Sequence, residues 1–294
     1  MRPKKSFILV LNKQVILAVA GAVLVLSLFF FGKTSTVKKE MPQPAKSEIP
    51  HFNFDDTLIA LKQKLSPAQL IYINNIENNV SRGNIKSQSE NQYNTLADFW
   101  KDSVASFIPY AYYLSEAAKL DNSEKKLTFA ARLILENMRR ETNPAVKVWE
   151  AQTAATLFEQ ALKINPESDE LKVGLGSCYV YGAGMVGDAA QTMKGIQQLL
   201  SVVQKDSNNM QAQLVLGIGG IISNQLDKGI ERLNKVVSFD PHNLEAVSWL
   251  ADAYAAKGDK GNAIKWYEQS KHLVNNPEFN KEIDLRIKEL NENH

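Results

Sequence analysis

An internal period of 34 residues constrains this chain more strongly than any other feature of its sequence. The units that begin at Met210 and Leu244 are 34 residues apart, and the unit that begins at Asp169 carries a seven-residue insertion. The same two positions recur in these units as Leu175 and Gly176, Leu216 and Gly217, and Leu250 and Ala251. A period of this length is typical of paired helices, because each pair buries its apolar face only by stacking on its neighbours. The sequence therefore predicts an all-α solenoid of helical hairpins.

The repeating positions resemble a known signature. In the last full unit they hold Leu250, Ala251, Tyr254, Gly258, Ala263, Tyr267 and Ser270. This set resembles the tetratricopeptide repeat (TPR) family, with Leu, a small residue and Tyr in the first helix and Ala, an aromatic and a small residue in the second. The middle unit has Gly220 at the Tyr position, which predicts a closer approach of its two helices. The resemblance covers about residues 95–275, is best over 169–275, and implies that first helices line a groove for another protein.

The solenoid is one of six predicted segments. They are a short basic tail (1–14), a transmembrane helix (15–32), a Pro-containing linker (33–51), an N-terminal helical pair (52–85), the solenoid (86–275, clearest repeats 169–209, 210–243 and 244–275) and a C-terminal capping helix (276–294). In the helical pair, Ser66 and Gln69 are spaced as a capping box. In the last segment one helix side holds Phe279, Ile283, Ile287 and Leu290, which suits a cap over the final repeat.

The first segments predict a membrane anchor. Residues 14–32 form 19 positions without a charge, and as a helix they span close to the ~30 Å of a bilayer's hydrocarbon core. A cleaved signal peptide is the competing interpretation, favoured by the basic start at Arg2, Lys4 and Lys5. However, the apolar run exceeds the usual length of about 7 to 15 residues, and no small-x-small cleavage site follows it. We therefore expect an uncleaved, single-pass anchor.

The orientation of this anchor is weakly marked. Four Lys or Arg residues precede the span and four follow it before residue 50, so the positive-inside rule favours neither orientation of the anchor. The short amino-terminal tail favours an extracytoplasmic C-terminal domain. In a bacterium with two membranes, that domain would be periplasmic.

The outward positions of the first helices are the predicted partner-binding groove. They are Val173, Ser177, Gln211, Leu214, Ile218, Glu245, Ser248 and Asp252. Chaperone-binding members of the TPR family clamp a peptide carboxylate with Lys, Arg and Asn at such places, and this chain lacks those residues there. The predicted groove is apolar in the middle and acidic at the end, which favours an amphipathic helix or an extended apolar segment as its partner.

One motif favours a different class of protein. Gly182, Gly184 and Gly187 match G-x-G-x-x-G, residues 178–181 could form a preceding strand, and Asp206 lies at the spacing of a ribose-binding acid. An NAD-binding enzyme is therefore an alternative. The repeat is in phase on both sides of the motif, which instead places the glycines in a lengthened turn capped by Asp188. This insertion loop is also a candidate partner contact, because insertions in repeat proteins often map to the binding face.

Other residue patterns indicate neither catalysis nor a cofactor. The four histidines have no metal-ligand spacing, and the single cysteine, Cys178, is predicted to be a small buried thiol. Removing the four basic residues before the span leaves 30 Lys and Arg against 32 Asp and Glu, with no basic stripe for nucleic acid. Charge clusters such as Glu136, Arg139 and Arg140 are predicted to be solvated helix surface.

The sequence thus predicts a membrane-anchored TPR scaffold that mediates protein–protein interaction, as an assembly or biogenesis factor in the cell envelope. No enzyme activity, metal or cofactor is expected. A TPR factor of the cytochrome-maturation type is a narrower alternative, suggested only by the order of the segments.

Overall fold

The computed structural model describes residues 51–82, 86–184 and 187–292, and these ranges contain helices and no β-strand. The α-helices are α2 (Phe54–Lys62), α3 (Pro67–Arg82), α4 (Lys86–Asp98), α5 (Phe107–Asp121), α6 (Glu124–Arg140), α7 (Pro144–Ile164), α8 (Asp169–Cys178), α9 (Ala189–Lys205), α10 (Met210–Ile222), α11 (Leu226–Phe239), α12 (Leu244–Ala256), α13 (Lys260–Val274) and α14 (Pro277–Glu292). Two π-helical turns, η1 (Phe99–Ser103) and η2 (Tyr179–Ala183), extend α4 and α8.

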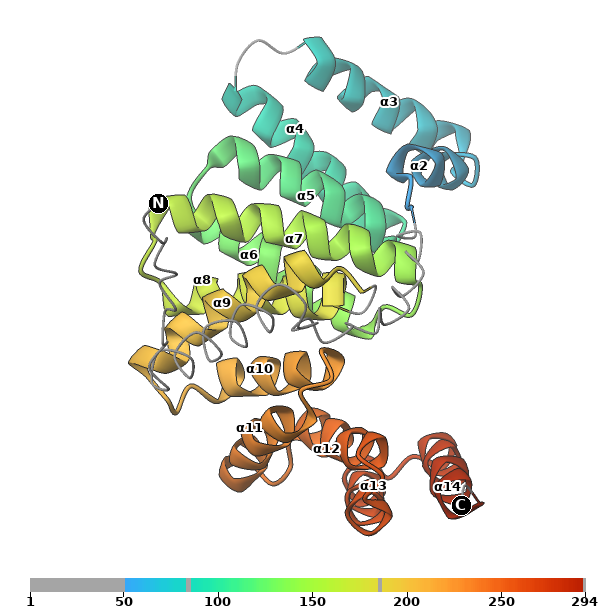
Figure 1. Ribbon diagram of the computed structural model, residues 1–294. Helices are drawn as coiled ribbons and strands as arrows, with labels where there is room; N and C mark the ends of the chain where they lie inside the picture. Colours follow the sequence, from blue (N-terminus) through green and yellow to red (C-terminus); the bar gives the residue numbers. More distant parts are fainter. Residues whose placement is uncertain (1–50, 83–85, 185–186, 293–294) are drawn as a thin grey trace, which may run out of the picture. The chain divides into compact units, whose positions relative to one another are not determined.

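From α4 onward, successive helices pair as hairpins, and each hairpin stacks on the next (Figure 1). The pairs are α4 with α5, α6 with α7, α8 with α9, α10 with α11, and α12 with α13. The prediction of an all-α solenoid of helical hairpins is confirmed. The repeats at 169–209, 210–243 and 244–275 each contain one of the last three pairs.

Capping side chains define where five of the six helices of these repeats begin, and only α11 lacks one. α8, α10 and α12 start after Ser168, Asn209 and Asn243, whose side-chain oxygens accept a hydrogen bond from a backbone N–H three residues further on. α9 and α13 start in the same way after Asp188 and Asp259. Each cap satisfies a donor that the first helical turn leaves unpaired. The predicted cap at Asp188 is confirmed.

Small residues let the two helices of a hairpin approach closely. A Cβ atom on Gly195 of α9 would lie 2.9 Å from the carbonyl oxygen of Gly176 in α8. In the next hairpin, a Cβ atom on Gly220 would lie 3.1 Å from the Cα atom of Gly229. The closer approach predicted from Gly220 is therefore confirmed, because a Tyr side chain at this position would collide with the backbone of α11.

The N-terminal helices share their core with the first hairpin. Ile73 of α3 is buried in one apolar cluster with Leu96 and Trp100, next to α5. Ser66 and Gln69 exchange the two hydrogen bonds of the predicted capping box at the start of α3. The predicted boundary between a helical pair at 52–85 and the solenoid thus does not coincide with a break in the core.

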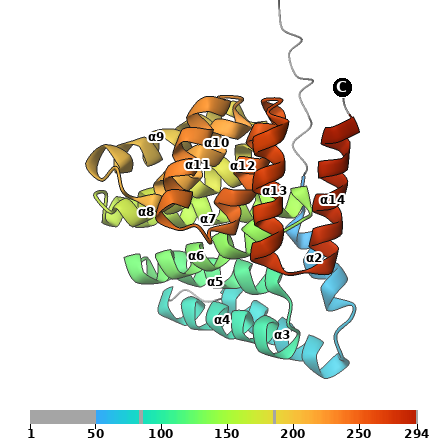
Figure 2. The ribbon, with the colours of Figure 1, turned by 90° about the horizontal axis from the view of Figure 1, so that it is seen from below.

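At the other end, α14 covers the last hairpin as predicted (Figure 2). Ile283 is buried against Ala263 and Tyr267 of α13, and the rest of the apolar side of α14 packs on the same cluster. The Nη1 atom of Arg286 donates to Asp252 of α12 over 3.0 Å. This helix closes the apolar end of the stack, which an uncapped repeat would expose to water.

The predicted membrane span at 15–32 and the linker at 33–51 fall almost wholly outside the described residues. The chain divides into a unit of residues 1–47 and a unit of residues 48–294, and all described helices belong to the second. Among those helices, none combines the length and the apolar character that a bilayer crossing requires.

Candidate functional site

The first helices of four successive hairpins form a continuous row. α8 packs against α6 and α10, and α10 packs against α12. We call the surface of α6, α8, α10 and α12 the first-helix face. It carries all the predicted groove residues, because each of them lies on α8, α10 or α12.

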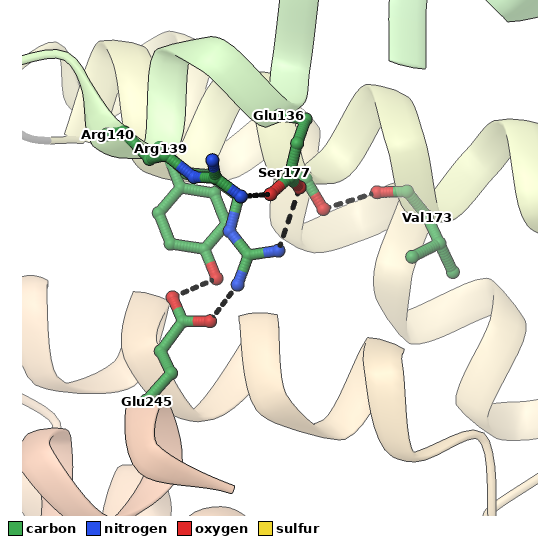
Figure 3. Close-up of polar contacts among 7 residues, drawn as sticks. Glu136, Arg139, Arg140, Val173, Ser177 and Glu245 are labelled. Atoms are coloured by element: carbon green, nitrogen blue, oxygen red, sulfur yellow. Dashed lines mark hydrogen bonds and ion pairs between the residues drawn. The ribbon is translucent and has the colours of Figure 1, made fainter. Parts of the chain in front are cut away.

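The structure buries half of that predicted groove. Val173, Ser177, Leu214 and Ile218 are each 8% exposed or less. The three apolar members belong to one core cluster that also holds Met138 of α6 and Val180 of η2. The hydroxyl of Ser177 donates to the carbonyl oxygen of Val173 in its own helix, over 2.8 Å (Figure 3). The expectation of an open apolar groove at these positions is therefore wrong, because the first helices pack directly on one another there.

The other four predicted groove residues keep some access to solvent. Gln211 is exposed, and Ser248, Glu245 and Asp252 are half-buried. Asp252 is engaged within the fold, since its Oδ1 atom accepts hydrogen bonds from the Tyr267 hydroxyl and from the α14 guanidinium. A partner-binding role for Gln211, Ser248 and Glu245 stays a prediction.

Glu245 is the centre of a polar contact across the face. The hydroxyl of Tyr181 donates to Oε1 of Glu245 over 2.7 Å, and Nη2 of Arg139 donates to Oε2 (Figure 3). The guanidinium carbon of Arg139 lies 5.6 Å from the centre of the Tyr181 ring. Glu136 adds a second carboxylate 3.7 Å from Nη1 of Arg139. We call the set of Arg139, Tyr181 and Glu245 the clasp.

Burial and neighbouring charges keep both hydrogen-bond donors of the clasp protonated. Burial lowers the pKa of Arg139, but the charge of Glu245 and smaller contributions outweigh it, and the net shift is upward. Burial, and then the charge of Glu245, raises the pKa of Tyr181 well above its usual value. At neutral pH Arg139 is therefore a cation and Tyr181 a neutral donor, and both stabilise the carboxylate between them.

The sequence did not indicate the clasp. Arg139 was predicted to lie on a solvated surface, and Tyr181 fell in the possible strand before the glycine motif. Arg139 and Glu245 are 106 residues apart, so no local pattern relates them. The interaction exists only because α6 ends near the point where α12 begins.

The glycine motif does not have the context of a dinucleotide site. The expected strand at 178–181 is helical, as the end of α8 and the start of η2. A Cβ atom on Gly182 would lie 2.2 Å from that of Ala151, so this glycine permits η2 to pack on α7. Gly184 ends η2, and Gly187 has a φ of +77° in the turn before α9. The three glycines thus lie at the end of η2 and just before α9, and their role in partner contact stays a prediction.

Cys178 is a buried thiol, as predicted. Burial raises its pKa, so the reactive thiolate is disfavoured. Beside it, a cavity of about 70 Å³ lies between α7, η2 and α9, with Gln191 on its wall. Among the described residues, no group of His, Cys, Asp or Glu side chains is placed to hold a metal ion.

The most exposed large apolar side chain on the described part of the first-helix face lies on α6. Phe129 is 57% exposed and lines a hollow of about 820 Å³ together with Lys125, Arg132, Leu133 and Glu136. The opposite side of α6 is buried at Leu127, Ala130, Ala131, Ile134 and Met138. Phe129 lies off this apolar stripe, which is a signal that the sequence contained. It was missed because the clear repeats in the sequence begin only at residue 169, after α6.

Comparison with known proteins gives limited similarity. No family model matches the chain. BBSome complex member BBS4 of Mus musculus is 27% identical over 119 residues, which are 40% of this chain and 21% of the relative. The chain thus spans about a fifth of the length of this curated relative. The BBS4 protein of Bos taurus is 25% identical over 123 residues.

Several solved structures are similar to part of the chain. The 41-end form of MamA from Desulfovibrio magneticus RS-1 is 22% identical, with a TM-score of 0.45, over 63% of this chain and 94% of its own. TTC0263, a thermophilic TPR protein of Thermus thermophilus, is 14% identical, with a TM-score of 0.48, over 68% of this chain and 98% of its own.

The repeat period and the helix packing of this chain assign its fold. Its 34-residue period corresponds to stacked hairpins with capped first helices and close glycine contacts. The chain therefore has the helical-hairpin solenoid fold of the tetratricopeptide-repeat proteins.

Proposed function

We propose that this chain is a membrane-anchored TPR scaffold that binds another protein through the exposed part of α6, and that it serves assembly or biogenesis in the cell envelope. The observation that carries the binding role is Phe129, a large apolar side chain more than half exposed on the first-helix face. The membrane role rests on the uncharged stretch at 14–32.

The surroundings of Phe129 suit a protein partner. Aromatic side chains ringed by charged ones dominate many protein interfaces, because the ring is desolvated while the charges orient the partner. Here Leu133 extends the apolar strip by one helical turn, and Lys125 and Glu136 supply charges of opposite sign at its rim. An amphipathic helix with one apolar strip and mixed flanking charges is the partner that such a surface fits.

Changing Phe129 to Glu is expected to lower the capture of the partner from detergent extracts by about tenfold or more, because a buried aromatic contact is replaced by a desolvated charge. The measurement is the amount of one specific protein retained by full-length bait. Phe239→Glu is the matched control, because Phe239 is an exposed Phe on α11, away from the first helices. If both variants lost capture of the partner equally, or if Phe129→Glu lost none, the interface would lie elsewhere on the protein.

The anchor makes a separate prediction. Full-length protein should sediment with membranes after alkaline carbonate washing, whereas a chain that begins at residue 48 should stay in the supernatant. The reason is that a helix of about 20 apolar residues resists extraction, while a repeat domain held by polar contacts does not. Protease added to spheroplasts should digest the repeat domain. Carbonate-soluble full-length protein would contradict the anchor, and protection from the protease would reverse the orientation.

A further inference from the structure

We propose that the clasp of Arg139, Tyr181 and Glu245 holds the first-helix face closed, and that its release uncovers the apolar side chains of α8 and α10. The clasp then acts as a built-in gate. It depends on the proposed function only for what the uncovered surface is used for, since closing requires no partner.

The geometry places the clasp across the row of first helices. Arg139 lies in the last turn of α6 and Glu245 in the first turn of α12, with α8 and α10 between those helices in the row (Figure 1). Their side chains are 32% and 23% exposed, so the ion pair is partly withdrawn from water. Charged hydrogen bonds in such settings are stronger than exposed ion pairs.

The apolar side chains of α8 and α10 that share a cluster with Tyr181 are shielded from water by neighbouring helices. Tyr181 belongs to the same core cluster as Val173, Leu214 and Ile218. α10 contains no charged residue, whereas α8 and α12 both carry acidic side chains in their first turns. Nine residues of α10 are buried, so separation of the neighbouring first helices would expose apolar side chains to water.

The clasp is also a separable contact. α6 and α12 do not pack as a helix pair, in contrast to the two helices of each hairpin. Ion pairs weaken as salt rises, whereas apolar packing between hairpin helices does not. Loss of the clasp is therefore expected to let α6 and α12 separate while every hairpin stays folded.

Thiol labelling tests this directly. The full-length chain with Cys178→Ala receives one cysteine reporter. It is either Ile218→Cys on the first helix α10, or Leu233→Cys on α11, which packs against Gly217 inside the α10–α11 hairpin. Both positions are fully buried. Adding Glu245→Gln is expected to speed maleimide labelling at position 218 about tenfold or more, which equals about 1.4 kcal/mol of opening free energy. Labelling at position 233 should not change. High salt should reproduce the effect in the chain with Glu245 intact.

Two further measurements control for disturbance of the core by the introduced cysteine itself. Exchanging the charges, with Arg139→Glu and Glu245→Arg together, should restore part of the slow labelling that either single change loses, because the ion pair is rebuilt but an arginine cannot accept the Tyr181 hydrogen bond. Binding of an apolar dye such as ANS, with Glu245→Gln as the only change, should rise while the helical circular dichroism stays the same. Unchanged labelling at position 218 together with unchanged dye binding would overturn the gate, and so would a parallel rise in labelling at position 233, which signals general unfolding. Because no partner is present, these outcomes are independent of the Phe129 experiment.

Discussion

Replacing Glu150 by Gln is expected to stabilise the protein at pH 8 by up to about 3 kcal/mol and to leave its stability at pH 4 nearly unchanged. Glu150 lies on α7 and is fully buried. Its Oε1 atom accepts one hydrogen bond from Nδ2 of Asn137 over 2.7 Å, and its Oε2 atom has no hydrogen-bond partner. Burial, the largest cause, raises its pKa from 4.5 to about 7, while the Asn137 hydrogen bond opposes the shift.

The sign of the pH dependence follows from these two values. Between pH 4.5 and about 7 the folded protein keeps the Glu150 proton and the unfolded chain has lost it. The folded state binds more protons, so stability falls as pH rises through this window and then stays low. The Gln variant has no proton to lose, and its contribution should be flat.

Urea unfolding followed by helical circular dichroism at pH 4, 6 and 8 measures this difference. Glu231→Gln is the control, because Glu231 is an exposed carboxylate on α11. It should leave the loss of stability between pH 4.5 and 7 intact. A Glu150→Gln variant that retains the full pH dependence would show that another group causes it.

Replacing Gly195 by Val is expected to destabilise the fold by about 3 kcal/mol or more, because overpacking a close helix contact forces the backbones apart. The new Cβ atom would meet the Cβ atom of Tyr179 at 2.7 Å and the carbonyl oxygen of Gly176 at 2.9 Å. Neither atom can rotate away, since one is backbone and the other is attached to it. The midpoint of urea unfolding measures the loss.

A second glycine provides the matched control. A Cβ atom on Gly261 in α13 would meet only Oδ1 of Asp259, at 3.9 Å. Gly261→Ala should therefore stabilise the protein by about 0.5–1 kcal/mol through helix propensity. If Gly195→Val were neutral, or if both substitutions destabilised equally, close approach would not be the reason for the glycine in α9.

The prediction of hairpins from sequence succeeded where the signal was local. Leu175, Leu216 and Leu250 mark one period, and Ser168, Asn209 and Asn243 cap the starts of α8, α10 and α12. These signals act over a few residues, so they survive in a single sequence. The period weakened at α6 and α7, which have 17 and 21 residues, and α6 was not identified as a first helix.

The prediction of the site failed where burial depends on the next repeat. Leu214 and Ile218 lie at outward positions of α10, and the period alone could not show that neighbouring first helices cover them. The same limit applied to Arg139, whose charge suggested a solvated surface. The clasp depends on the position of α12, three hairpins away.

The sequence by itself determined that this chain stacks capped helical hairpins, because period, caps and small contact residues are set within one repeat. It also contained the uncharged stretch from which we propose the anchor. Only the tertiary structure decided which outward side chains stay exposed. Burial at these positions depends on how successive hairpins pack on one another, and the same packing brings Arg139 to Glu245 from 106 residues away. It leaves Phe129 exposed and Ile218 buried.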